Sequence, residues 1–152
     1  MSGAPDATAL LRTLRAAHVR GATRATLLAT ACERIRAWGA PFTSVYAYLL
    51  QGDSLVLEAY AGRATEHRRI PVGTGVCGTA IARGQDQNVA DVRTVENYLA
   101  CNLETQSELV VLIRRGAAVL GQLDVDSDVP AGFSEDHHRA VKEVADALAV
   151  LL

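Results

Sequence analysis

The feature that most constrains the fold is a change in hydrophobic period near residue 40. Apolar side chains recur three and four residues apart between residues 23 and 38, a spacing typical of an amphipathic helix. The runs Phe42–Leu50 and Ser54–Tyr60 are instead rich in Val, Leu and Tyr and are separated by Gln51–Gly52–Asp53. Two extended runs joined by such a short turn predict a β-hairpin.

The other segments repeat this combination of helices at the ends and short strands between. We expect helices over 6–19, from the Gly-rich stretch to Arg83, and after the capping Ser134. We expect extended segments at 68–72, 88–90, 108–113 and 118–125, with a long loop at 91–105 containing a helical turn around 95–99. Hairpin-linked strands with helices at both chain ends predict an α+β fold with the helices on one face of the sheet.

The length of 152 residues predicts one domain. Within it, 1–39 are expected to form the N-terminal helices, 42–126 the sheet and the site loops, and 134–152 the C-terminal helix. The 15 basic and 17 acidic residues leave a net charge of -2, which argues against a nucleic-acid surface. The chain also lacks an apolar run long enough to cross a membrane and an N-terminal signal segment. We therefore expect a cytoplasmic protein without a membrane or nucleic-acid partner.

The chain has three cysteines, Cys32, Cys77 and Cys101. An odd count without a secretory signal argues against a disulfide framework, and the absence of a C-x-x-C pair argues against a structural zinc site. Cys32 shares the apolar face of the second expected helix, which indicates a buried structural thiol. Cys77 lies where the Gly-rich stretch enters a helix, a position at which the helix dipole favours a thiolate. Cys101 lies in the long loop, where a cysteine is either incidental or reactive.

The Gly-rich stretch Gly73–Gly78 formally matches G-x-G-x-x-G, a dinucleotide-binding pattern. That pattern requires a buried strand before it and a parallel βαβ unit around it. Here the preceding strand is short and contains Pro71, and its neighbours pair as hairpins. A tight turn into a helix therefore remains a simpler reading of these glycines, beside a role for Cys77 in a site.

Asp124 and Asp126 alternate with apolar residues, so in a strand both carboxylates project from one face. The run Asp124–Asp128 with Glu135 also imitates a calcium loop, but Val129 replaces the required glycine and a strand precedes it. A solvated acidic turn is a further alternative. If the face looks into a closed pocket, repulsion raises one pKa and yields a proton donor beside an anion. The adjacent His137 and His138 diverge on a helix and indicate no metal site.

Several motifs taken together resemble one family. They are Arg69–Ile-Pro-Val-Gly-Thr-Gly-Val-Cys-Gly-Thr-Ala80, Ala90–Asp-Val92, Leu99–Ala-Cys101, Ser107–Glu-Leu-Val-Val111 and Gly121–Gln-Leu-Asp-Val-Asp-Ser127. Over about residues 42–150 the chain is similar to the free methionine-(R)-sulfoxide reductases, which are stand-alone GAF domains. The resemblance implies a central six-stranded antiparallel sheet, with N- and C-terminal helices on one face and a loop-built pocket on the other.

The resemblance also implies a chemistry for the singled-out residues. Cys101 would be the nucleophile, and Glu108, Asp124 and Asp126 would bind the substrate, protonate the sulfoxide oxygen and pair with the ammonium group. Cys77 would be a further site thiol, able to form a disulfide with the sulfenic acid left on Cys101. Aromatic walls would come from Phe42, in the place of a family tryptophan, and from Tyr46. The implied partners are free methionine sulfoxide, thioredoxin as external reductant and a second copy in a homodimer, with no bound cofactor or metal.

The sequence departs from the family at several positions. The family's further cysteine before R-I-P-V aligns with Glu66 or His67, so Cys77 resolves the sulfenic acid, a small external thiol does, or turnover is impaired. Asn102 replaces an acid beside Cys101, and Leu112 replaces a proline. These departures keep open an alternative function as a non-catalytic GAF domain that binds a small ligand or senses redox state through its thiols. A nucleotide-binding regulatory GAF domain is a third interpretation.

Overall fold

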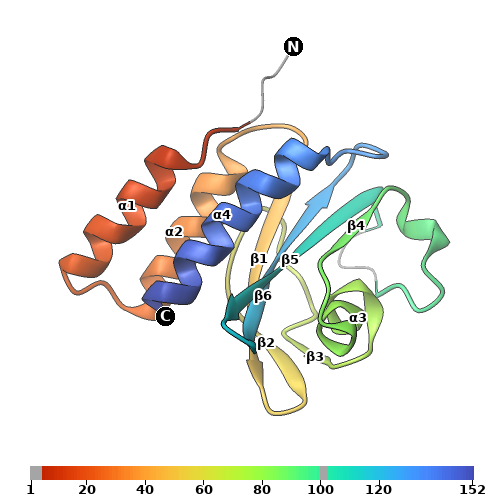
Figure 1. Ribbon diagram of the computed structural model, residues 1–152. Helices are drawn as coiled ribbons and strands as arrows, with labels where there is room; N and C mark the ends of the chain where they lie inside the picture. Colours follow the sequence, from red (N-terminus) through yellow and green to blue (C-terminus); the bar gives the residue numbers. More distant parts are fainter. Residues whose placement is uncertain (1–4, 100–102) are drawn as a thin grey trace.

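A computed structural model describes residues 5–99 and 103–152 of the chain (Figure 1). The helices are α1 (Thr8–Val19), α2 (Arg24–Arg36), α3 (Gly75–Arg83), the 3-10 turn η1 (Val92–Thr94) and α4 (Glu135–Leu151). The strands are β1 (Ser44–Gln51), β2 (Ser54–Ala61), β3 (Arg69–Pro71), β4 (Gln87–Val89), β5 (Ser107–Arg115) and β6 (Ala118–Ser127).

The strands of the described residues form one six-stranded sheet in the order β3-β2-β1-β6-β5-β4, and every neighbouring pair is antiparallel. The hairpin expected around residues 51–53 joins β1 to β2, and a second hairpin joins β5 to β6. The central pair β1–β6 brings together segments about 80 residues apart in sequence. The α+β fold and the antiparallel six-stranded sheet expected from the resemblance are thereby confirmed.

Helices α1, α2 and α4 cover one face of the sheet (Figure 1). The apolar stripes of α2 and α4 pack on the strand residues that point to this face, including Val45, Leu109 and Leu123, and α1 packs against α2 and α4. Ser134 caps α4, as expected, by accepting a hydrogen bond from the backbone N–H of His137 at 3.2 Å. Cys32 is fully buried in this core, and burial raises the pKa of its thiol to about 12, which confirms it as a packed thiol.

The opposite face of the sheet carries α3 and the segments around it (Figure 1). A second apolar cluster here contains Tyr46, Tyr48 and Val110, which alternate along their strands with residues of the helix-covered face. Because side chains in a strand alternate between faces, each central strand contributes to both cores. The site residues described below belong to this second face.

The loop between β4 and β5 differs in detail from the expectation. Its helical turn is η1 at Val92–Thr94, three residues earlier than the turn expected around 95–99. The side chain of Asp91 accepts a hydrogen bond from the backbone N–H of Arg93 and starts the turn there. Among the described residues, no helix is both long and apolar enough to span a bilayer.

Candidate active site

Three acidic side chains of β5 and β6 lie on the sheet face that carries α3. Glu108 pairs directly with Asp126 across the two strands, and Asp124 pairs with the next residue of that face, Val110. The side-chain alternation of the strands therefore groups Glu108, Asp124 and Asp126 on one surface. They are 4%, 0% and 3% exposed, so the cluster is buried rather than solvated.

Cys77 reaches this cluster from the first turn of α3. Its Sγ lies 3.8 Å from Oε2 of Glu108, and the residue is 5% exposed. The amide Nε2 of Gln122, on β6, donates a hydrogen bond to the backbone carbonyl of Cys77 at 3.2 Å. This bond fixes the start of α3 over the acidic residues.

One donor atom from each of Cys77, Glu108 and Asp124 lies within 4.8 Å of the other two. A thiolate and two carboxylates at this spacing are ligands that a divalent cation such as zinc accepts. The same grouping also suits proton transfer, since a thiol and carboxyl groups in hydrogen-bonding range can share protons.

Burial dominates the electrostatics of the two aspartates. It raises the pKa of Asp124, although the nearby Glu108 and Cys77 lower it in part. The pKa of Asp126 lies well above its usual value, because burial is reinforced by the charges of Asp124 and Asp128 and only partly opposed by Arg63. Asp126 is therefore the carboxyl of this pair that is most strongly held in its protonated form.

The buried carboxyl oxygens are also short of hydrogen-bond donors. In the described part of the chain, neither oxygen of Asp124 has a partner in hydrogen-bonding geometry, and the same holds for Oδ1 of Asp126. A buried polar group without a partner costs about 1–3 kcal/mol, so a donor that reaches these oxygens would be favourable. Such groups are well placed to bind a polar ligand that enters the cluster.

The predicted nucleophile Cys101 and its neighbour Asn102 lie outside the described residues. The last described residue before them, Leu99, packs against Gly75, where an added Cβ would lie 2.9 Å from the Cβ of Leu99. Leu99, Cys77 and Glu108 line a small enclosed cavity together with Ile70 and residues 74–76. Its volume of about 10 Å³ corresponds to roughly one water molecule.

The prediction that Phe42 forms a wall of this site is wrong. Its ring lies in the core on the helix-covered face, 5.3 Å from Trp38, 5.7 Å from Phe133 and 5.3 Å from His137 between centroids. Phe42 precedes β1, so the alternation of that strand does not direct it to the site face. Tyr46, in contrast, lies within β1 and on the site face, where the resemblance placed it.

The positions of the side chains decide the readings of the acidic run after Leu123 as a calcium loop or a solvated turn, and they show the contacts of the two adjacent histidines. Asp124 and Asp126 lie in the buried part of β6 and Asp128 pairs with Arg63, so they form neither a calcium loop nor a solvated turn. His137 completes the capping box of α4, and Nε2 of His138 lies 2.8 Å from Oδ2 of Asp86.

The Gly-rich stretch turns from β3 into α3. Gly73 and Gly75 have positive φ values of 93° and 66°, and an added Cβ at Gly78 would lie 2.6 Å from the carbonyl oxygen of Pro71. The glycines are therefore required for the tight turn and the close packing that hold Cys77 in place.

Sequence reasoning did not identify Arg63, which forms the main ionic contact beside the site. Its Nη1 and Nη2 lie 2.7 Å from the two carboxylate oxygens of Asp128, and its Nη2 lies 2.8 Å from Oε2 of Glu104. The partners are 65 and 41 positions away in sequence. No local pattern signals such pairs, because only the sheet topology brings them together.

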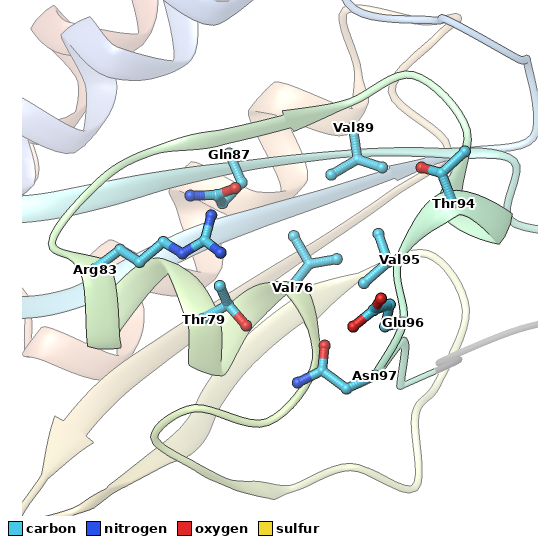
Figure 2. A pocket seen from close by; sticks show the side chains of 9 residues that line it. All are labelled: Val76, Thr79, Arg83, Gln87, Val89, Thr94, Val95, Glu96 and Asn97. Carbon is cyan, nitrogen blue, oxygen red and sulfur yellow. The ribbon is translucent and has the colours of Figure 1, made fainter.

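The larger hollow on this side of the molecule is a separate groove of about 620 Å³ between α3, β4 and the η1 loop (Figure 2). Figure 2 shows Arg83 and Gln87 at one end, with Thr94, Glu96 and Asn97 toward the other. The acidic cluster does not line this groove, and Val76 is the residue that both hollows share. We therefore assign the site to the buried cluster.

The chain is similar to known proteins of one domain family. A family model for the GAF domain matches residues 21–152. The free methionine-R-sulfoxide reductase of Escherichia coli is 37% identical over 105 residues, which are 69% of this chain and 63% of that protein. The protein of the same name from Saccharomyces cerevisiae is 37% identical over 101 residues, 66% of this chain and 53% of that protein. The chain thus spans less than two thirds of the length of these relatives.

Solved structures are similar over more of their length. The type II free methionine-R-sulfoxide reductase of Thermoplasma acidophilum has a TM-score of 0.81 and 34% identity, covering 84% of this chain and 91% of that one. The enzyme of Neisseria meningitidis in complex with its substrate has a TM-score of 0.84 and 29% identity, covering 99% and 93%. The chain therefore belongs to the GAF domain family and, within it, to the free methionine-R-sulfoxide reductases.

Proposed function

We propose that this protein reduces free methionine-(R)-sulfoxide to methionine, with Cys101 as the nucleophile. The observation that carries this proposal is the buried cluster of Cys77, Glu108, Asp124 and Asp126 on one sheet face. Sulfoxide reduction by a thiol needs a proton for the departing oxygen, and the cluster contains a carboxyl group, Asp126, whose pKa is raised well above its usual value by burial. The family assignment adds independent support.

The first step transfers oxygen from the substrate to the thiol. The Cys101 thiolate attacks the sulfoxide sulfur while Asp126 protonates the sulfoxide oxygen. The attack forms a transient bond between the two sulfur atoms. This bond and the sulfur–oxygen bond of the substrate both break as the oxygen passes to the cysteine sulfur. Methionine is released, Cys101 is left as a sulfenic acid, and Asp126 recovers the proton that the thiol lost.

The remaining carboxylates explain a preference for the free amino acid. An ionised Glu108 or Asp124 can accept hydrogen bonds from the substrate ammonium group, which a methionine residue inside a peptide lacks. For Asp124 this contact would also supply the donors that its buried oxygens lack among the described residues.

The catalytic cycle closes when a thiol reduces the sulfenic acid. Cys77 condenses with the Cys101 sulfenic acid, so that a disulfide forms and water leaves, and thioredoxin then reduces the disulfide by thiol exchange. Cys77 is the described thiol that lies on the site face, since Cys32 belongs to the opposite core. His67 and Glu66 supply no thiol at the family's other resolving position.

A coupled assay tests the activity. With thioredoxin, its reductase and NADPH, we expect NADPH oxidation on free methionine-(R)-sulfoxide and much slower oxidation on the S epimer or on a peptide containing methionine sulfoxide. Cys101→Ser should abolish formation of methionine even in a single turnover, whereas Cys32→Ala should retain it. Absence of turnover with a competent reductant, together with a Cys77–Cys101 disulfide formed by peroxide, would replace the enzyme with a redox sensor.

A further inference from the structure

Arg63 connects three segments around the acidic cluster. It lies in the loop between β2 and β3, its guanidinium binds both oxygens of Asp128 just beyond β6, and it also reaches Glu104. Glu104 follows Cys101 by three positions in the sequence, and Asp128 follows Asp126 by two. The Arg63 side chain thus links the segment that follows the predicted nucleophile in the sequence to the strand that holds the predicted proton donor.

The backbone of Arg63 is itself fixed from β1. Its N–H donates to Oγ of Ser44 at 3.0 Å, and its carbonyl accepts the hydroxyl hydrogen of Tyr46 at 2.7 Å. Gly62 permits this close approach: its φ is +106°, and an added Cβ would lie 2.5 Å from Oγ of Ser44. Because the backbone is held in place, the side chain has less freedom to lose when it forms its ion pairs.

We propose that Arg63 is a positioning residue, which clamps the segment entering β5 at Glu104 to the end of β6 and so holds the end of the acidic cluster that carries Asp126 in place. The proposal rests on the proposed function for its catalytic part, but the clamp itself is a structural claim. Exposed ion pairs usually contribute little. The contact with Asp128 differs because it is bidentate and partly buried and because the backbone of Arg63 is anchored, and the more exposed Glu104 adds a single contact from a third segment.

The positive charge of Arg63 also affects the titration of Asp126. The charged groups around the Asp126 carboxyl are Asp124 on its own strand, Glu108 opposite it on β5, Asp128 beyond the strand end and Arg63 from the β2–β3 loop. Arg63 lowers the pKa of Asp126, against burial and the acidic neighbours that raise it. Removal of the guanidinium charge should therefore move the Asp126 titration to higher pH.

The first test measures the clamp without using activity. Hydrogen exchange of the full-length protein should show faster exchange in Arg63→Gln around residues 92 and 106, whose amides bond to Gln106 and Ser127 carbonyls. Arg63→Lys should be intermediate, because an ammonium cannot form the bidentate contact. Arg93→Gln is the matched control. It removes an exposed arginine of the β4–β5 loop whose ion pair with Asp91 stays within that loop. Unchanged exchange in Arg63→Gln would overturn the proposal.

The second test uses turnover. Arg63→Gln should lower kcat by about 10- to 100-fold with a smaller effect on KM, as expected when a proton donor is displaced from its productive position. Its pH profile should retain activity to higher pH than the wild type, and Arg93→Gln should match the wild type within about twofold. A uniform loss of active protein with an unshifted pH profile would show a merely structural role and contradict the proposal. If the wild type itself lacks turnover, the exchange experiment still decides whether the clamp exists.

Glu104→Gln and Asp128→Asn provide variants that leave Arg63 in place. Each removes the charge of one arm, so each should reproduce part of the exchange difference, and Asp128→Asn should give the larger effect because that arm is bidentate. Equal and negligible effects of both variants would contradict the clamp.

Discussion

The thiol of Cys77 and the carboxyl group of Glu108 meet across the site, with Sγ 3.8 Å from Oε2. The contact joins the first turn of α3 to β5, two elements about 30 residues apart in sequence. It places a thiol in direct contact with the acidic cluster rather than on the surface. In the proposed function, this is the thiol that resolves the oxidised nucleophile.

Removal of the Cys77 thiol should separate the first turnover from the following ones. In Cys77→Ser we expect about one equivalent of methionine per protein, because Cys101 still attacks, followed by loss of thioredoxin-dependent turnover, because no disulfide forms. Rapid-quench measurement of methionine together with NADPH oxidation checks this. Cys32→Ala, which alters a thiol of the other core, is the control. Wild-type steady-state rates in Cys77→Ser would assign resolution to an external thiol.

Asp126→Asn should lower activity and, as pH rises, raise thermal stability relative to the wild type. The side chain can no longer donate a proton from a carboxyl group, so kcat/KM should fall by about 100-fold or more. Because the pKa of Asp126 is raised in the folded protein, its stabilising contribution is present below the unfolded pKa of about 4 and is lost as pH rises through the folded value. The variant should therefore gain Tm relative to the wild type as pH rises.

Asp128→Asn is the matched comparison for that pH dependence. Arg63 lowers the pKa of Asp128, so its contribution has the opposite sign: it is present above the unfolded pKa and lost as pH falls through the folded one. Thermal unfolding across about pH 3–8 should give opposite trends for the two variants. Parallel trends would show that burial does not control the Asp126 titration.

Gly78→Ala should disturb the site through packing alone. A Cβ at this position would lie 2.6 Å from the carbonyl oxygen of Pro71 and 2.9 Å from the amide nitrogen of Gly73, so α3 must shift. We expect a loss of about 1–3 kcal/mol in the free energy of unfolding and reduced turnover, since Cys77 shifts with the helix. Urea unfolding and the coupled assay measure both effects. Thr79→Ala, at the next, half-buried position, should change each much less.

Phe42→Leu tests the placement of this ring away from the site. Loss of its packing with Trp38, Phe133 and His137 should lower the free energy of unfolding by about 1–2 kcal/mol and leave KM unchanged. Tyr46→Phe makes the opposite comparison, because it loses the hydrogen bond to Arg63 on the site face and should raise KM. A raised KM in Phe42→Leu would return Phe42 to the substrate pocket.

The sequence alone determined most of the helices and strands and the shared face of Asp124 and Asp126. The change of period near residue 40 predicted the β1–β2 hairpin, and the alternation of Asp124 and Asp126 predicted their shared face, because both patterns follow from local side-chain geometry. The resemblance added Glu108 to the same group, and the strand register places it opposite Asp126.

Only the tertiary structure decided which contacts surround that face. Phe42 turned to the helix-covered core because it lies just outside β1, where strand alternation no longer applies. Arg63 met Asp128 because a loop and a strand end far apart in sequence lie side by side in the folded sheet. Burial of Asp126, which raises its pKa, likewise depends on all the layers packed around it, so no local pattern could predict its extent.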